Sequence, residues 1–413
     1  MNNNILEKAN YCLNCKNKPC SVEGCPLNND IPTFINLVKQ EKYEEAFNVL
    51  TKTTVIPAIC GRICPHFKQC MGSCIRGIKG QPVQIGELES FVGDKAIENG
   101  YRILKDKDQD LLGKKIAIIG GGPAGLTAAA FATKRGAECT IYEKYNHLGG
   151  ILSHGIPEFR LPLEIVNKSI EKILELGIKV ELNKELGRNL KLEDLENKYD
   201  NIILAFGANI SSKMGIEGED IKGVYGGNEL LEHNNHPNYK EKTIIVNGGG
   251  NVAMDTARTI KRLGAEKVIV VYRRAREQMP AESKEIEDAV KEGIEFWFQN
   301  NIVRIIGNEK NEVSKVELIR TKLVQNEGER LIPENIEGSN YIIDCDYVVM
   351  AIGSHAEEFV QNLGLNINKK GGIEVDKKGR TSNPKIYAIG DLAGNVQTVA
   401  WAARSGRDVI ENI

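Results

Sequence analysis

The chain has 413 residues, of which 41% are apolar and 27% charged, and its formal net charge is −2. This composition predicts a globular protein of two or three domains and excludes a broadly cationic protein that binds nucleic acid. The N-terminal residues lack the basic start and apolar core of a signal peptide, and no apolar run reaches the ~20 residues of a transmembrane helix, so we expect a cytoplasmic protein without membrane contact.

Eight of the ten cysteines lie in two blocks near the N-terminus. The first runs from Cys12 to Cys25 with the spacing C-x2-C-x4-C-x4-C-P, and the second from Cys60 to Cys74 with the spacing C-x3-C-x5-C-x3-C. In a reducing compartment such a group indicates metal binding or redox chemistry, not disulfides. Zinc ribbons use two separated pairs, whereas a run that ends in Cys-Pro is closer to iron–sulfur ligation. Two [4Fe–4S] clusters are therefore favoured, with zinc or unliganded thiols as alternatives.

The pattern of apolar and polar residues changes after residue 108. Residues 1–108 show helical patterns, such as that of 31–50, and no convincing strand; the charged stretch 105–110 predicts a linker. Beyond it, apolar β-branched runs alternate with amphipathic segments, which is typical of βαβ units around a parallel sheet. Strands are expected at 115–120, 139–144, 201–207, 243–248, 267–274, 347–353 and 385–391.

A first glycine-rich turn follows the strand at 115–120. In "KIAIIGGGPAGL", Gly120, Gly122 and Gly125 form G-x-G-x-x-G between a strand and an alanine-rich helix. These glycines permit a tight turn, a close approach to a pyrophosphate and close packing of helix on strand. Glu143 ends the next strand, where an acid accepts hydrogen bonds from ribose hydroxyls.

A second such turn follows the strand at 243–248. In "TIIVNGGGNVAMDTAR", Gly248, Gly250 and Ala253 give G-x-G-x-x-A, but the next strand ends in Arg273 and Arg274 instead of an acid. Guanidinium groups pair with a ribose 2′-phosphate, which a carboxylate would repel. This site is expected to prefer NADPH over NADH; a merely solvated basic turn is the alternative.

One acid-type and one arginine-type turn in a single chain predict FAD and NADPH, and hence hydride transfer between them. A flavin holds two electrons and iron–sulfur clusters accept them singly, which favours clusters over zinc at the cysteines. Near the C-terminus, Asp391 follows the strand at 385–391, and residues 397–410 are expected to form a helix.

The motifs "CLNCKNKPC", "PAICGRICPHFKQCMGSCIRG", "GGILSHGIPEFRLP", "GGGNVAMDTAR", "VVYRRAREQMPAE" and "YAIGD" resemble one family over nearly the whole chain. This is the glutamate synthase small (beta) subunit family, which includes the NADPH-oxidising part of dihydropyrimidine dehydrogenase and related NADPH:FAD:[4Fe–4S] oxidoreductases. The resemblance implies an α/β fold with two Rossmann-like dinucleotide-binding domains, preceded by an α-helical domain with two [4Fe–4S] clusters.

The resemblance also implies metal ligands. One cluster would be held by Cys12, Cys15, Cys20 and Cys74, and the other by Cys25, Cys64, Cys70 and Glu89. Cys60 would then be a spare thiol. The first block has four residues, Ser21–Gly24, between its third and fourth cysteines, one more than the family pattern, so Cys60 stays open as an alternative to Cys25.

For the dinucleotides, the motifs and the resemblance together give two sets of residues. The FAD set is Gly120, Gly122, Pro123, Ala124, Gly125, Glu143, Gly150, Ile151, Arg160, Gly390 and Asp391. The NADPH set is Gly248, Gly250, Asn251, Val252, Ala253, Arg273, Arg274, Ala351 and Gly353. No side chain is expected to act as a catalytic acid, base or nucleophile, because the cofactors carry the chemistry.

The expected domains are a helical iron–sulfur domain at 1–108, a discontinuous FAD domain at 109–240 and 351–413, and an NADPH domain at 241–350. The expected function is that of an electron-input subunit, which passes electrons from NADPH through FAD and the clusters to a partner. That partner is the large subunit of glutamate synthase, the FMN subunit of dihydropyrimidine dehydrogenase, or ferredoxin. A zinc-stabilised scaffold without turnover is the alternative of another class.

Overall fold

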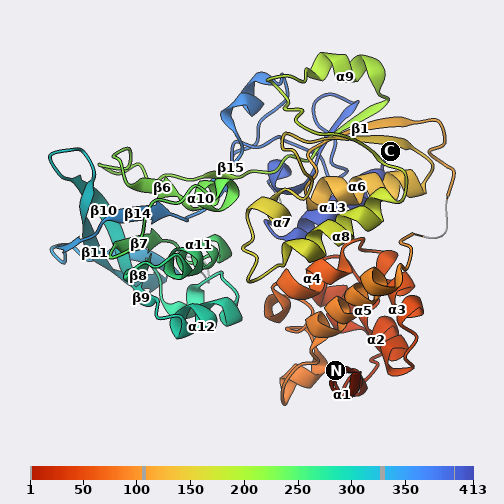
Figure 1. Ribbon diagram of the computed structural model, residues 1–413, viewed down its shortest axis with the longest axis horizontal. Coiled ribbons are helices and arrows are strands. Elements are labelled where there is room, and N and C mark those ends of the chain that lie inside the picture. The colour runs from red at the N-terminus through yellow and green to blue at the C-terminus, as the bar shows by residue number, and fades with distance from the viewer. Residues whose placement is uncertain (1, 105–107, 326–330, 395) are drawn as a thin grey trace. The chain divides into compact units, whose positions relative to one another are not determined.

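The computed structural model describes residues 2–104, 108–325, 331–394 and 396–413 (Figure 1). The chain divides into two compact units, Met1–Ala208 with Ala356–Ile413, and Asn209–His355. Lys105–Lys107, the first half of the expected linker, lie outside the described residues.

The first unit begins with helices and short helical turns, and no strand occurs among its described residues before Lys115. The α-helices are α1 (Asn2–Asn10), α2 (Ile31–Lys39), α3 (Tyr43–Thr51), α4 (Pro57–Ile63) and α5 (Ile85–Asn99). Short helical segments carry or border the cysteines: the π-helix η1 (Cys20–Gly24) and the 3-10 helices η2 (His66–Lys68) and η3 (Ile75–Ile78).

The remainder of the first unit is a parallel sheet with helices. Its strands run in the order β16-β4-β1-β2-β3, and every neighbouring pair is parallel. The strands are β1 (Lys115–Ile119), β2 (Glu138–Tyr142), β3 (Lys179–Glu181), β4 (Asn201–Leu204) and β16 (Ile386–Ala388). The helices are α6 (Pro123–Lys134), α7 (Ile151–His154), α8 (Leu163–Leu174), α9 (Leu192–Lys198), η5 (Glu358–Asn362), η6 (Gly390–Ala393) and α13 (Val399–Ile410).

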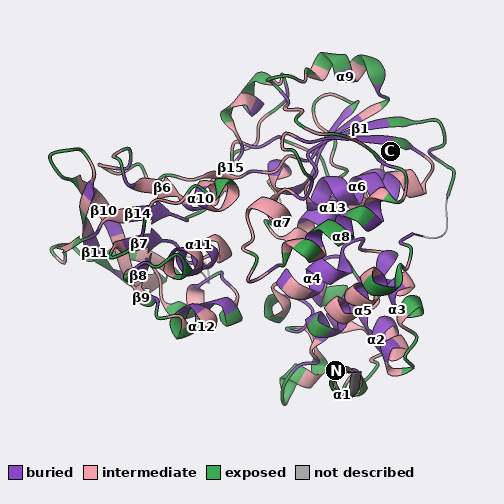
Figure 2. Cartoon of the chain, viewed as in Figure 1, coloured by how far each residue is buried: buried purple, intermediate pink, exposed green. Residues whose placement is uncertain are grey.

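One hydrophobic core joins the N-terminal helices to this sheet. Side chains such as Phe34, Ile59 and Leu88 belong to the same buried cluster as Ile116 of β1 and Ala128 of α6. Figure 2 shows α6 largely in the colour of buried residues. Helices α4, α5 and α8 are also in contact. The helical segment is thus packed as part of the first unit, not as a separate body.

The second unit also contains a parallel sheet, in the order β6-β14-β7-β8-β9. Its strands are β6 (Val224–Gly226), β7 (Thr243–Asn247), β8 (Lys267–Tyr272), β9 (Glu295–Phe298) and β14 (Tyr347–Met350). Its helices are α10 (Gly227–His233), α11 (Asn251–Arg262), η4 (Arg276–Gln278) and α12 (Ser283–Lys291).

An antiparallel sheet in the second unit was not expected from the sequence. It consists of β10 (Asn300–Gly307), β11 (Val313–Gln325), β12 (Leu331–Asn335) and β13 (Tyr341–Asp344), in which β11 pairs with the other three. A two-stranded ribbon of β5 (Ile210–Ser211) and β15 (Ser354–His355) completes the unit.

The division of the chain differs from the expected boundaries at 240/241 and 350/351. Residues 209–240 belong to the second unit, which ends at His355. The reason is β6, whose three residues pair with β14 in the second sheet, while β5 pairs with β15. Strands of two or three residues are too short to show a hydrophobic period, so no sequence pattern marks this boundary.

Candidate functional site

The first glycine turn lies between β1 and α6, and close backbone contacts explain its glycines. Gly120 has a positive φ of 107°, and a Cβ there would lie 2.6 Å from the carbonyl oxygen of Ala205. A Cβ on Gly125 would lie 2.0 Å from the carbonyl oxygen of Gly120. Only glycine fits both positions, so the turn stays tight and its N–H groups remain accessible at the start of α6.

Glu143 follows β2 and is buried beside this turn. Its Oε2 accepts a hydrogen bond from the Gly121 N–H at 2.7 Å, and its Oε1 accepts one from the Tyr145 N–H at 3.0 Å. Gly150 approaches from the other side, since a Cβ there would lie 2.9 Å from the Cα of Gly122. Ile151 begins α7, and Arg160 is half-buried in the segment that leads to α8.

Asp391 lies in η6, which follows β16 at the same carboxyl edge of the sheet. Its Oδ1 is buried, with no hydrogen-bond partner among the described residues. Burial raises the pKa of this carboxyl to about 6. A Cβ on Gly390 would lie 3.2 Å from Cβ of Ala124, so η6 lies against the start of α6. A buried carboxylate oxygen without a described donor, beside a glycine turn, fits a bound dinucleotide that offers hydroxyl groups.

The second glycine turn, between β7 and α11, repeats this geometry in the second unit. Gly248 has a φ of 148°, and a Cβ there would lie 2.1 Å from the carbonyl oxygen of Ala351. Gly250 precedes α11, whose first residues are Asn251 and Val252 and whose Ala253 is fully buried. The Oδ1 of Asn251 accepts a hydrogen bond from the Glu282 N–H at 3.0 Å.

Arg273 and Arg274 directly follow β8. Arg273 is exposed, and Arg274 is half-buried with an Nε that has no hydrogen-bond partner in the described part of the chain. Their backbone is fixed by contacts that the sequence did not reveal. Thr321 of β11 donates from Oγ1 to the Arg273 carbonyl at 2.9 Å, and the Gln299 N–H donates to the Arg274 carbonyl at 3.1 Å. Strand β11 and the residue between β9 and β10 therefore anchor the backbone of the two arginines, and a phosphate fits their charge.

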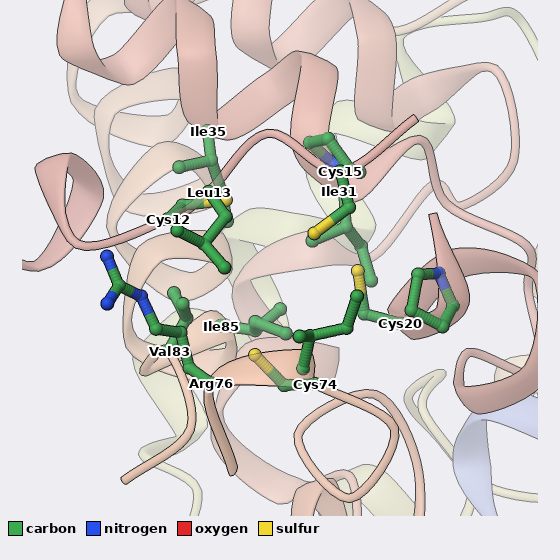
Figure 3. A pocket seen from close by; sticks show the side chains of 13 residues that line it. Cys12, Leu13, Cys15, Cys20, Ile31, Ile35, Cys74, Arg76, Val83 and Ile85 are labelled. Carbon is green, nitrogen blue, oxygen red and sulfur yellow. The ribbon is translucent and has the colours of Figure 1, made fainter. Parts of the chain in front are cut away.

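Four of the expected ligands line one pocket. Cys12, Cys15, Cys20 and Cys74 surround it together with apolar side chains such as Ile31 and Ile85 (Figure 3). Burial raises the pKa of Cys20 to about 11 and also raises the pKa of Cys12. Thiols in apolar surroundings become thiolates only beside a compensating cation, so this donor set fits a metal-containing group.

The other expected ligands form a second group. Glu89 of α5 is buried, and burial raises its pKa to about 8. Burial, with the nearby Glu89 as a further cause, raises the pKa of Cys25 to about 12 and that of Cys70 well above the ordinary value. Cys64 has a strongly raised pKa because of its hydrogen bond with Cys60 and its burial.

Cys60 belongs to this second group as well. It lies beside Cys64 and contributes to the raised pKa of Cys25, and its Sγ lies 3.9 Å from Oγ1 of Thr54. Four sulfurs and one carboxyl group therefore gather where four ligands are expected. The choice between Cys25 and Cys60 stays open.

Three residues near the second group were missed in the sequence. Asn29 donates from Nδ2 to Oε1 of Glu89 at 3.0 Å, and Thr53 donates from Oγ1 to Oδ1 of Asn29 at 2.6 Å. His66 places Nδ1 3.6 Å from the sulfur of Cys70. Asn29 and Glu89 are 60 positions apart, so no local pattern could have linked them.

The cysteine thiols of the two groups are not arranged around a single metal ion. Within the described ranges, no three His, Cys, Asp or Glu side chains could hold a single metal ion. A [4Fe–4S] cluster binds its four protein ligands through different irons, so its thiolates surround a volume. The pocket of Figure 3 has this form.

Comparison with known proteins gives the family. Residues 114–406 match the pyridine nucleotide-disulphide oxidoreductase family, and residues 1–101 match the family described as dihydropyrimidine dehydrogenase domain II, 4Fe-4S cluster. The small chain of glutamate synthase [NADPH] from Escherichia coli K12 is 35% identical over 426 residues, which cover 98% of this chain and 90% of that one. This chain belongs to the glutamate synthase small-chain family.

Some relatives are longer than this chain. The beta subunit of NADP(+)-dependent formate dehydrogenase from Moorella thermoacetica is 35% identical over 415 residues, which cover 94% of this chain but 58% of that subunit. Among solved structures, Mycobacterium tuberculosis FprA in complex with NADPH has a TM-score of 0.65 at 20% identity, and the match covers 72% of this chain and 83% of FprA. That likeness shows the shared fold.

As a member of the glutamate synthase small-chain family, the protein is a pyridine-nucleotide oxidoreductase with an N-terminal 4Fe-4S domain. The expected α/β dinucleotide-binding fold with an N-terminal, mostly helical 4Fe-4S domain is confirmed, and so is the enzyme class. The two relatives are named as a chain and a subunit of larger enzymes, which implies a partner subunit. None of the described helices is both long and apolar enough to cross a bilayer.

Proposed function

We propose that this chain is an electron-input subunit, which oxidises NADPH in its second unit and passes the electrons through FAD and two [4Fe–4S] clusters of its first unit to a partner protein. The observation that carries the proposal is that two groups of thiols and the acid-type glycine turn share one compact unit. The arginine-type turn lies in the other unit.

In the second unit, this chain's residues bind and select the pyridine nucleotide. The Gly248 turn offers backbone N–H groups to a pyrophosphate at the start of α11. Arg273 and Arg274 pair with the ribose 2′-phosphate, and the Nε of Arg274 has no hydrogen-bond partner among the described residues. We therefore expect NADPH, not NADH, as the electron donor.

In the first unit, the Gly120 turn, Glu143 and Asp391 hold FAD. The turn receives the pyrophosphate, while the two carboxyl groups accept hydrogen bonds from hydroxyls of the ribose and the side chain of the flavin. Bound FAD supplies the chemistry of accepting two electrons as hydride and releasing them one at a time. The protein orients that group and shields it from water.

The two thiol groups support two clusters. The first pocket carries Cys12, Cys15, Cys20 and Cys74. The second group carries Cys64, Cys70 and Glu89 with either Cys25 or Cys60. A carboxylate is a harder ligand than a thiolate, so we expect the second cluster to differ from the first in reduction potential.

The large subunit of glutamate synthase is the first candidate for the partner, because the chain covers most of the length of that enzyme's small chain. The FMN subunit of dihydropyrimidine dehydrogenase is the second candidate, since the N-terminal match carries that enzyme's name. A ferredoxin is the third.

Anaerobic purification tests the proposal directly. We expect about eight irons per chain, as two [4Fe–4S] clusters require, together with one FAD. NADPH should bleach the flavin bands and the broad cluster absorbance, and NADH should do so far more slowly. Two zinc ions per chain without iron would support the scaffold alternative and overturn the proposal.

Substitution of the arginines tests the nucleotide assignment separately. Arg273→Ala with Arg274→Ala should lower kcat/KM for NADPH by about a hundredfold or more, since each of the two charge-assisted contacts contributes roughly 1.5–3 kcal/mol. The value for NADH should change little. Arg320→Ala, at an exposed position of the same unit, is the matched control. Equal losses with both nucleotides would contradict the assignment.

A further inference from the structure

Exposed apolar side chains surround the first thiol pocket. Leu13 and Ile75 line the pocket beside Cys12 and Cys74, yet half of Leu13 is exposed, as is 39% of Ile75. Ile78 is 76% exposed, and Tyr11 is exposed as well. A cluster of exposed apolar residues next to a redox group is typical of a surface that another protein covers.

Specific contacts of Tyr11 join the two distant segments that carry these residues. Arg76 donates from Nε to the Tyr11 carbonyl at 2.9 Å, and its guanidinium lies 4.2 Å from the centre of the Tyr11 ring. Tyr11 also donates from its hydroxyl to the Gln81 carbonyl at 3.2 Å. Figure 3 labels Arg76 and Leu13 among the side chains around the pocket. The surface is therefore fixed before any partner arrives.

The segments around the first pocket carry mainly positive charge. Segments 11–22 and 60–86 contain six lysines and arginines and no aspartate or glutamate, although the whole chain has a net charge of −2. Lys18 pairs with Asp30, and Arg62 pairs with Asp94. Lys16 and Lys79 are exposed.

The nearest acids along the chain do not reverse this balance. Glu87 forms an ion pair with Lys8, and the other acids that flank the first segment are Glu7, four positions before Tyr11, and Glu23. The region around the first pocket thus keeps a local excess of positive charge, which attracts an acidic surface over about one Debye length, roughly 8–10 Å.

We propose that Tyr11, Leu13, Ile75 and Ile78, flanked by Lys16 and Lys79, form the docking surface for the electron-accepting partner, whose own face is apolar at the centre and acidic at the edge. We call this surface the first-cluster rim. The inference rests on the proposed function, because it needs electrons to leave through the cluster of Cys12, Cys15, Cys20 and Cys74. The apolar centre brings the partner close to the thiols, and the lysines speed and orient its approach.

Two soluble haem proteins of opposite charge serve as probes. The haem domain of cytochrome b5 is acidic, cytochrome c is basic, and each accepts one electron. One NADPH reduces two ferric haems, with release of NADP+ and one proton. With the intact protein, we expect kcat/KM for cytochrome b5 to fall at least tenfold between 20 and 200 mM salt. The value for cytochrome c should not fall.

Charge reversal at the rim is the decisive variant. Lys16→Glu with Lys79→Glu should lower kcat/KM for cytochrome b5 at least tenfold and raise it for cytochrome c. Ile78→Ser should raise KM for cytochrome b5. The control is Lys191→Glu with Lys377→Glu, two exposed lysines elsewhere in the same unit, which should change neither probe by more than twofold.

Bleaching of the protein's own absorbance by NADPH, without any probe, separates the two hypotheses. If wild type and variants bleach alike and the rim variant reduces cytochrome b5 within twofold of wild type, the docking surface is wrong. The docking surface is also wrong if the control pair loses as much activity as the rim pair. If wild type does not bleach with NADPH, the proposed function fails, and the docking surface with it.

Discussion

Glu89 is an unusual residue for the middle of a helix. Its carboxyl group is buried, one hydrogen bond from Asn29 reaches it, and several thiols lie nearby. A buried carboxylate is strongly unfavourable unless a cation or several donors compensate it. Thiols supply no cation and are only weak donors. A cluster ligand at this position would explain why the sequence keeps an acid where a leucine would pack.

Substitution of Glu89 tests that role. Glu89→Ala should change the electron paramagnetic resonance signal of one reduced cluster, lower the iron content towards half, and leave the cluster of Cys12, Cys15, Cys20 and Cys74 intact. Cys25→Ser and Cys60→Ser are tested alongside, and one of the two should keep all the iron, because only one of these thiols is expected to be a ligand. Loss of iron from Cys60→Ser, with none from Cys25→Ser, would make Cys60 the ligand instead.

Asp391 makes the stability of the flavin-free protein depend on pH. Its folded pKa of about 6 lies above the ordinary value of 3.8, so between these values the folded protein binds more protons than the unfolded chain. The free energy of unfolding therefore falls as the pH rises through about 6. One pKa unit corresponds to about 1.4 kcal/mol, and solvent screening of this partly exposed residue reduces the effect to roughly 1–2 kcal/mol.

Asp391→Asn should consequently raise the Tm of the flavin-free protein by a few degrees at pH 7.5, with no difference near pH 4. Thermal unfolding monitored across this range measures the effect. Glu374→Gln, at an exposed position of the same unit, is the control. A loss of stability that is equal at every pH would show that the side chain acts through packing instead.

At the scale of elements, α13 links the two halves of the first unit. A Cβ on Gly406 would lie 2.2 Å from the Ala124 carbonyl, so α13 touches the backbone at the start of α6. On its other side, Arg404 donates from Nη1 to the Pro26 carbonyl at 2.9 Å, and Arg407 donates from Nη1 to the Leu27 carbonyl at 2.8 Å. The helix thus fixes the segment that follows Cys25.

Removal of Arg407 should loosen that segment. Arg407→Ala leaves the carbonyls of Leu27 and Thr53 without this donor, and we expect a loss of about 1–3 kcal/mol in the free energy of unfolding. Iron of the second group should be lost faster to a chelator, while the FAD content stays unchanged. Arg188→Ala, at an exposed surface pair with Glu185, should have neither effect. Equal chelation rates in both variants would contradict this role.

On the scale of the whole molecule, the sequence predicted the parallel sheets because their strands have strong local signals. All seven expected strands occur, from β1 to β16, since each combines a buried apolar run with a glycine or charged residue at its end. The glycine turns were predictable for the same reason: both need residues that no other side chain can replace at close backbone contacts.

Features that depend on distant pairing could not be predicted. The antiparallel sheet of β10–β13 alternates weakly, with many half-buried positions. The sorting of the cysteines into two groups brings Cys74 to Cys12 across 62 positions, and no spacing rule inside one block specifies it. Only the family resemblance suggested that grouping, and the structure gathers the same four thiols around one pocket.

The return of residues 356–413 to the first unit has a consequence for biosynthesis. Strand β16 pairs with β4, and α13 covers α6, yet both are synthesised only after the whole second unit. Until then, a nascent chain exposes an open sheet edge and the apolar side of α6, which invites aggregation. The segment after Cys25, which α13 holds through Arg404 and Arg407, should therefore become ordered only after α13 has been synthesised.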